Sequence, residues 1–379
     1  MASPYSITLS NLIYRIVHIT VLVSDIIKMA NDIKINIRQL VESDLPVASH
    51  MLRLAFGTFL GLPDPMTFSG DADNVKTRFL ADPTSTLAAE CANGQLVGFN
   101  FVTNWGSVGF FGPLIVHPDY WDQGVAKQLL GPTMNIFDKK WHTKHVGLFT
   151  FAQSTKHVGL YQKFGFWPRF LTMIMSRPTW PVEEQEQEQE QQQQQRKRNN
   201  SNTSSIYWSK YSEIPEHKQE QTLDKCRLLT NSVYDGLDVK HEIVAVKNQN
   251  LGDTILLYRN HNHNNNRTKD NNNNLAGFVV CHCGAGSEAG SGVCYIKFGI
   301  VLSDNYSQEN FRTLLNATSL LAKDRRLSRI VAGVNTERSK AYHYMVASGF
   351  RVDIQGVAMH RPNESGYNRS DVYLIDDWR

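Results

Sequence analysis

Apolar residues in the first half of the chain fall into short continuous runs that alternate with helix-spaced positions. The runs at 112–116 and 146–151 have the length of buried strands. Between them, Val125, Leu129 and Leu130 have the spacing expected on the buried face of a helix. The pattern therefore predicts a strand, a helix and a second strand in succession, as in a mixed α/β domain.

Upstream of these elements, the pattern predicts the opening of the same domain. Residues 35–40 read as a strand, and the acidic residues at 42–44 mark a helix start. The segments 87–91 and 96–102 flank the turn sequence Ala-Asn-Gly-Gln, which predicts a β-hairpin.

The second half of the chain repeats this order of elements. Leu-Ala-Gly-Phe at 275–278 corresponds to Leu-Val-Gly-Phe at 96–99, and Gly349-Phe350 corresponds to Gly165-Phe166. The chain is therefore expected to contain two domains of one fold. The elements expected between those landmarks in the second half are strands at 293–302 and 330–334 and a helix at 311–322. The strand-like start of 371–379 is expected to pair with either sheet.

Two low-complexity segments separate the expected parts. The run at 183–205 contains no apolar residue that could be buried, which predicts a solvated linker. The Asn-rich run at 260–274 lies at an expected hairpin tip, where an insertion costs little loop entropy. We expect a leader at 1–30, a first domain at 31–179, a linker at 180–206 and a second domain at 207–379 that carries the insertion 260–274.

The leader is apolar from Leu12 to Ile27, but Arg15, His18 and Asp25 interrupt it. It is too short and too charged for a comfortable membrane span, and it lacks the features of a secretory signal. Three interpretations remain open: a dispensable or mis-assigned leader, a helix on the domain or on a membrane surface, and an organellar targeting segment.

The segment from Val116 to Leu130 points to phosphate binding. Pro118 ends the strand, and a short loop containing Gly124 turns directly into the helix. Such a loop directs free backbone N–H groups and the positive end of the helix dipole outward, which suits a phosphate. Gly124 and Ala126 carry no side chain that would keep a phosphate from the backbone. The alternative is a strand–loop–helix unit that binds no ligand.

Two motifs in this order resemble the GNAT family of acetyl-CoA-dependent N-acetyltransferases. The family's phosphate loop, Gln/Arg-x-x-Gly-x-Gly/Ala, corresponds to residues 121–126, with Trp121 in place of the leading Gln or Arg. The family's later Leu-Tyr-x-x-x-Gly-Phe corresponds to residues 160–166. The resemblance covers roughly residues 31–178.

The resemblance implies an α/β fold of the α+β type, with two GNAT-like domains that each have a central mixed, mostly antiparallel sheet flanked by helices. It implies acetyl-CoA as acyl donor, an amine as acceptor, direct attack without a covalent enzyme intermediate, and no metal. Tyr161 lies at the family's general-acid position. The expected acetyl-CoA contacts are Leu114, Ile115 and Val116 on the strand, Gln123, Gly124, Val125, Ala126 and Lys127 in the loop, and Ser154.

The second copy departs from the family pattern at both motifs. The segment 303–311 has no glycine, and Asp304 and Glu309 would repel a phosphate. When Gly349 is aligned with Gly165, Met345 takes the place of Tyr161. We expect a degenerate domain that packs on the first within the same chain and shapes its active site.

The general base cannot be identified from the sequence. Glu90, His117 and Asp119 are candidates, although Glu90 could face solvent and His117 could cap the strand end; Asn104 and Trp105 are candidates to line an amine pocket. Two other functions remain open: a non-catalytic acyl-CoA-binding or scaffold protein, and an acyltransferase acting on a hydroxyl or a protein N-terminus.

Composition limits the expected partners and the expected cellular compartment. The net charge of +3 over 379 residues gives no electrostatic case for nucleic acid as a partner. The sequence gives no firm indication of membrane association. Five cysteines, an odd and small number, favour a reducing compartment, and the expected location is the cytoplasm.

Overall fold

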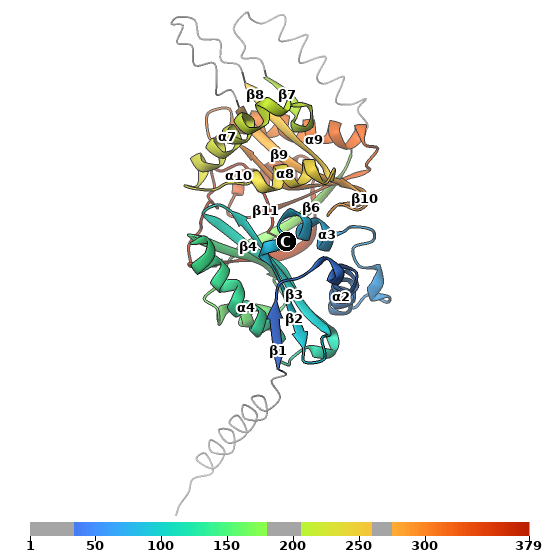
Figure 1. The fold of residues 1–379 in the computed structure, drawn as a ribbon. Helices are drawn as coiled ribbons and strands as arrows, with labels where there is room; N and C mark the ends of the chain where they lie inside the picture. Colours follow the sequence, from blue (N-terminus) through green and yellow to red (C-terminus); the bar gives the residue numbers. More distant parts are fainter. Residues whose placement is uncertain (1–33, 180–205, 260–274, 379) are drawn as a thin grey trace, which may run out of the picture.

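The computed structural model describes residues 34–179, 206–259 and 275–378, which form one continuous sheet with helices on both faces (Figure 1). The expected leader, the insertion at 260–274 and all but the last residue of the expected linker lie outside these residues. Along the sheet the strand order is β1-β2-β3-β4-β5-β12-β6-β11-β10-β9-β8-β7, and β13 pairs with β10.

The first half of the chain contains the elements that the apolar runs predict, with slightly different ends. Its strands are β1 (Ile35–Arg38), β2 (Thr86–Cys91), β3 (Leu96–Trp105), β4 (Val108–Val116), β5 (His145–Phe151) and β6 (Trp167–Pro178). Its α-helices are α2 (Leu45–Phe59), α3 (Asn74–Ala81), α4 (Val125–Asn135) and α5 (Thr155–Gln162). Shorter helical turns are η1 (Glu42–Asp44), η2 (Pro65–Thr67), η3 (Pro83–Ser85), η4 (Pro118–Tyr120) and the π-helical η5 (Ile136–Trp141).

The second half has the same succession of elements, as the internal repeat predicts. Its strands are β7 (Ile206–Lys210), β8 (Gly252–Arg259), β9 (Leu275–Gly284), β10 (Gly290–Val301), β11 (Arg329–Asn335), β12 (Arg351–Arg361) and β13 (Leu374–Ile375). Its helices are α7 (Glu216–Val233), α8 (Lys240–Asn248), α9 (Ser307–Asp324) and α10 (Ser339–Ala347), with the turn η6 (Tyr211–Glu213).

Strand pairing shows that the two halves are related by symmetry about the centre of the sheet. The parallel pairs are β4 with β5 and β10 with β11, and the remaining neighbours pair antiparallel. Read from β12 and β6 outward, β5 and β4 on one side therefore correspond to β11 and β10 on the other. This mixed, mostly antiparallel sheet confirms the fold class that the resemblance implies.

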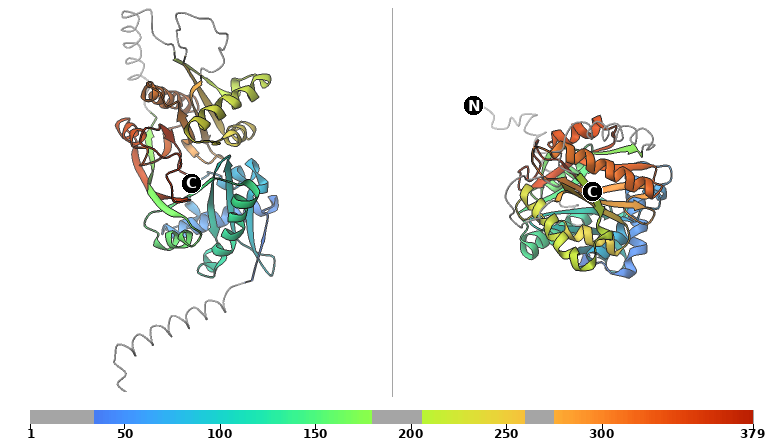
Figure 2. Two further views of the ribbon diagram at one scale, coloured as in Figure 1. Left: turned by 90° about the vertical axis from the view of Figure 1, so that its left-hand side faces the viewer. Right: turned by 90° about the horizontal axis from the view of Figure 1, so that it is seen from above.

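The two central strands are exchanged between the halves. β12, from the second half, lies between β5 and β6 and pairs with both. β6, from the first half, lies between β12 and β11. The two strands run side by side along the flank that joins the halves, β6 in green and β12 in red (Figure 2, left). Each half thus completes its sheet with a strand from the other.

Helices cover both faces of the sheet and create separate cores. α2 and α3 bury Met51 and Val75 against Phe99 of β3, whereas α4 buries Leu129 against Val97. A third core crosses the junction of the halves: Trp105 of β3 packs there with Phe298 of β10, their ring centroids 5.3 Å apart. Within the described ranges, no helix has both the length and the apolar character needed to cross a membrane.

Candidate functional site

β4 and β5 separate midway along their length, and this opens the sheet. Their parallel pairing runs from Val108 opposite His145 to Phe110 opposite Gly147 and ends there. At Gly112, which has a φ of 138°, β4 bulges away from its register with β3. Because backbone groups of a strand point alternately to its two sides, those of 114–116 that face β5 are left out of the β4–β5 ladder.

The opened part of β4 leads directly into the loop that the sequence predicts to bind phosphate. After the turn η4, Gly124 caps α4 with a left-handed φ of 79°, which favours glycine. The first N–H groups of α4 have no partner earlier in the helix, so they and the helix dipole form the positive end. Gln123 and Ala126 are half-buried, Val125 is buried and Lys127 is exposed. The structure thus brings the predicted strand and loop together.

The side chains at 121–123 are held by contacts to the end of β4, to the preceding turn and to α5. The Trp121 indole N–H donates to the Val116 carbonyl at 2.8 Å, and the Gln123 amide donates to the Asp119 carbonyl at 2.7 Å. Asp122 forms an ion pair with Lys156 of α5 at 2.7 Å, which offsets its negative charge beside the loop. Trp121, the departure from the family motif, therefore ties the loop to the end of β4.

Tyr161 lies beside the point where β4 and β5 separate. Its ring centroid is 5.6 Å from that of Phe111, the first β4 residue beyond the pairing with β5. The side chain is buried, and burial raises the pKa of Tyr161 well above its ordinary value of 10. A phenol of this kind remains protonated, so it can donate a hydrogen bond to a developing thiolate.

Ser154 lies at the N-terminus of the same helix. It is buried, and its hydroxyl is 2.8 Å from Nδ1 of His157. The His157 ring lies between Phe59 of α2 and Tyr161, with centroid distances of 5.3 and 6.5 Å. Ser154 is therefore linked to Tyr161 through His157.

The candidates for the general base are engaged in other contacts. Glu90 accepts a hydrogen bond from Nε of Arg38 at 2.6 Å, in an ion pair. His117 accepts the Asp119 N–H at 3.3 Å, so it caps η4, in keeping with its alternative interpretation. Trp105 was expected to line an amine pocket, and that expectation is wrong: it is 1% exposed in the core at the junction.

At the corresponding position of the second half, polar side chains bind local backbone groups. The Ser307 hydroxyl, at the start of α9, donates to the Leu302 carbonyl at 2.9 Å, and the Asp304 carboxylate accepts the Tyr306 N–H at 2.8 Å. Met345 is fully buried in α10, one turn before Gly349, which has a left-handed φ of 88°. Met345 thus takes the place that Tyr161 has before Gly165.

Sequence reasoning missed one charged group of the first half. Arg78 projects from α3 on the same buried face as Val75 and Phe79. A charged residue on an apolar helix face is a recognisable signal, because such a residue is rarely buried without a partner. Its carboxylate partner, Glu288, comes from the second half, more than 200 residues away in the chain, and no local pattern identifies it. Across the described segments, His, Cys, Asp and Glu side chains form no group of three or more that could hold a metal ion.

Comparisons with known proteins agree with this arrangement. Residues 56–166 match the model of the Acetyltransferase (GNAT) family. A candidate acetyltransferase from Pyrococcus horikoshii is 14% identical, with 91% of this chain and 95% of that chain covered at a TM-score of 0.57. A GCN5-related N-acetyltransferase from Sphaerobacter thermophilus is 12% identical, with 86% and 95% covered at a TM-score of 0.51. A tandem GNAT protein from the clavulanic acid biosynthesis pathway is 10% identical, with 86% and 98% covered at 0.50.

At these identities the structural likenesses show the fold alone. The chain shares its overall fold with these acetyltransferases. The match to the GNAT family model runs from α2 to Phe166, and the fold of the chain is similar to that of these proteins. No curated protein matches the sequence.

Proposed function

We propose that the protein is an acyl-CoA-dependent N-acetyltransferase whose active site is in the first half. The observation that carries this proposal is the continuity of the opened β4 strand with the glycine-capped start of α4, beside a buried tyrosine. The loop from Gln123 to Lys127 would hold the pyrophosphate of acetyl-CoA, and Leu114, Ile115 and Val116 would contact the pantetheine and thioester through their backbone. We also propose Ser154 as a contact to acetyl-CoA.

Direct transfer fits the groups that lie at the opening. The amine nitrogen attacks the thioester carbonyl carbon, and backbone N–H groups of β4 stabilise the oxyanion because they are fixed before the reaction. The carbon–sulfur bond then breaks, which yields the amide and the CoA thiolate. Tyr161 donates a hydrogen bond to that sulfur, and the proton lost by the amine passes to a base or water.

The second half is proposed to be non-catalytic. The contacts of Ser307 and Asp304 fill the start of α9, where a phosphate would have to bind, and Met345 cannot donate a proton. All five cysteines are free, which is compatible with the reducing, cytoplasmic location that we propose.

Calorimetry on the full chain tests the cradle. We expect the parent to bind acetyl-CoA and Gly124→Glu to lose roughly 100-fold or more in affinity, because like charges brought together cost several kcal/mol. Gly94→Glu is the matched control: Gly94 also has a positive φ, 84°, and its Cβ would meet nothing within 4 Å. Loss in Gly124→Glu alone supports the proposal. An absence of binding in the parent, or an equal loss in both variants, contradicts it.

Turnover separates an enzyme from a binding protein. Release of free CoA thiol would be followed with acetyl-CoA and a panel of amines, with matched alcohols as the comparison. Amine-dependent release supports the transferase. Binding without release from any acceptor would favour the non-catalytic alternative, and release with alcohols alone would favour hydroxyl transfer.

A further inference from the structure

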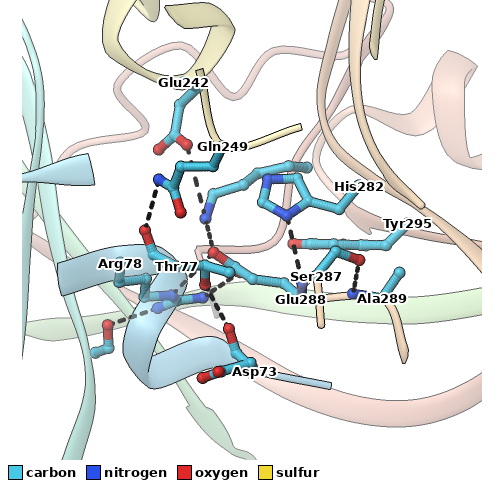
Figure 3. A network of polar contacts seen from close by, with 12 residues as sticks. Asp73, Thr77, Arg78, Glu242, Gln249, His282, Ser287, Glu288, Ala289 and Tyr295 are labelled. Carbon is cyan, nitrogen blue, oxygen red and sulfur yellow. Dashed lines mark hydrogen bonds and ion pairs between the residues drawn. The ribbon is translucent and has the colours of Figure 1, made fainter. Parts of the chain in front are cut away.

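A cluster of buried charges crosses the junction between the two halves. It consists of Arg78 from α3 of the first half together with Glu242, Glu288 and Lys297 from the second; we call it the Arg78 cluster (Figure 3). The side chains of Arg78, Glu288 and Lys297 are 7%, 2% and 6% exposed. Together with His282 of β9, these residues line a cavity of about 170 Å³.

Glu288 is the centre of this cluster. Its carboxylate receives two hydrogen bonds from Arg78, Nε to Oε1 at 3.3 Å and Nη2 to Oε2 at 2.8 Å. Lys297 donates to the same Oε1 and lies 3.7 Å from the Glu242 carboxylate. The two cations lower the pKa of Glu288 far below its ordinary value, although burial alone would raise it. Glu288 is therefore ionised.

The third arm of the Arg78 guanidinium reaches the strand of the candidate active site. Nη1 donates to the carbonyl of Gly112 at 2.6 Å. Gly112 is at the bulge of β4, two residues before the segment that we propose binds the thioester. Since a guanidinium is a rigid planar fork, a carboxylate that fixes two of its nitrogens also fixes the direction of the third.

We propose that Glu288 of the second half is a positioning residue for the first half: through Arg78 it holds the Gly112 carbonyl and thereby fixes the β4 backbone at 114–116. The degenerate half thus completes the other half's active site. The placement of β4 stands on the contacts alone, and its effect on turnover rests on the proposed function.

Other contacts hold α3 on the second half, so the effect of Glu288 can be isolated. The Asp73 N–H donates to the Ser287 carbonyl at 2.9 Å, and the Gln249 amide donates to the Thr77 carbonyl at 3.1 Å. Neither contact involves the Glu288 carboxylate. Replacing Glu288 by Gln therefore removes the charge that orients Arg78, while α3 stays attached at its N-cap and at Thr77.

The test compares Glu288→Gln in the full chain with Glu309→Gln. Glu309 is a matched control, because it also pairs with a buried arginine, Arg259, at 2.9 Å, but it does so at the start of α9 in the second half. The first readout is hydrogen–deuterium exchange of the β4 amides at 110–112 and 114–116. We expect exchange at least tenfold faster in Glu288→Gln than in Glu309→Gln, because Arg78 then no longer holds the Gly112 carbonyl of β4 in place.

The second readout is kinetic. We expect turnover of Glu288→Gln to fall by roughly 10–100-fold, since small misplacements of reacting groups are costly. Affinity for acetyl-CoA should change less than about threefold, because phosphate contacts at α4 are retained. Arg78→Lys, which keeps the charge and loses the fork, should give the same split between turnover and affinity. It also serves as the second variant if Glu288→Gln fails to fold.

The two proposals fail in distinguishable ways. If the parent protein neither binds acetyl-CoA nor releases CoA, the proposed function fails, and the exchange comparison still decides the role of Glu288. If both β4 exchange and turnover in Glu288→Gln equal those of Glu309→Gln, the positioning role is overturned. Equal loss of stability in both variants with unchanged β4 exchange would likewise reduce the cluster to a structural ion pair.

Discussion

Two buried histidines join the exchanged strand to the first half, and they predict how stability depends on pH. Nε2 of His145, at the start of β5, lies 2.8 Å from Nδ1 of His360 on β12. Burial lowers the pKa of His145 to about 4 and that of His360 to about 3, from an ordinary value of 6.5; nearby Arg169 contributes to both. Both rings are therefore neutral when the protein is folded at pH 7.

The direction and size of the effect follow from proton linkage. A histidine with a lowered folded pKa stabilises the protein fully above its unfolded pKa, and that stability is lost as the pH falls from 6.5 towards 4 and 3. Between pH 7.5 and pH 5.0 the unfolded chain takes up nearly one proton at each histidine while the folded chain takes up almost none. The expected loss is about 2 kcal/mol per histidine and about 4 kcal/mol for the pair.

Urea unfolding at several pH values measures this loss. The double variant His145→Gln, His360→Asn keeps polar atoms near the two bonded nitrogens and removes both titrations. Its free energy of unfolding should therefore fall by about 4 kcal/mol less than that of the parent between pH 7.5 and 5.0. His50→Gln, at an exposed position of α2, is the control and should behave as the parent. A double variant that loses as much stability as the parent would refute the reasoning.

Three further predictions concern the site and its packing. Tyr161→Phe should reduce turnover by roughly 100-fold with little change in acetyl-CoA affinity, as measured by thiol release and calorimetry, because only the proton donor is lost; unchanged turnover would remove Tyr161 from the mechanism. Calorimetry should find one acetyl-CoA per chain, because the segment before α9 has no glycine and its Asp304 carboxylate accepts the Tyr306 N–H; two sites would contradict this. Gly147→Val should destabilise the protein by more than about 1–3 kcal/mol in thermal unfolding, since its Cβ would lie 2.1 Å from the Trp378 ring; a melting temperature equal to that of the parent would show that Trp378 can move aside.

Local pattern predicted most of the elements, because each depends on its own residues. The apolar runs at 112–116 and 146–151 fall in β4 and β5, although β4 begins already at Val108, and Gly124 caps α4 as its motif indicates. The internal repeat also predicted the order of elements in the second half. These features require only apolar periodicity and glycine at a left-handed position, both of which are visible in one sequence.

Pairing between distant strands could not be predicted in the same way. β6 and β12 each follow a short helix and a glycine at positive φ, so their sequences are compatible with pairing inside one half or across both. The partners of Arg78 were hidden for the same reason, because Glu288 lies in a turn that has no apolar pattern of its own. Trp105 was misplaced since a tryptophan near a strand end suits a pocket wall and a core equally.

The exchange of β6 and β12 has a consequence during synthesis on the ribosome. When β6 emerges, β5 does not yet have its final neighbour, because β12 (Arg351–Arg361) follows more than 170 residues later in the chain. The strand exchange of the finished sheet can therefore form only after most of the second half has been translated. A nascent chain released early would carry the edge of β5 exposed, which makes premature termination a hazard for aggregation as well as for activity.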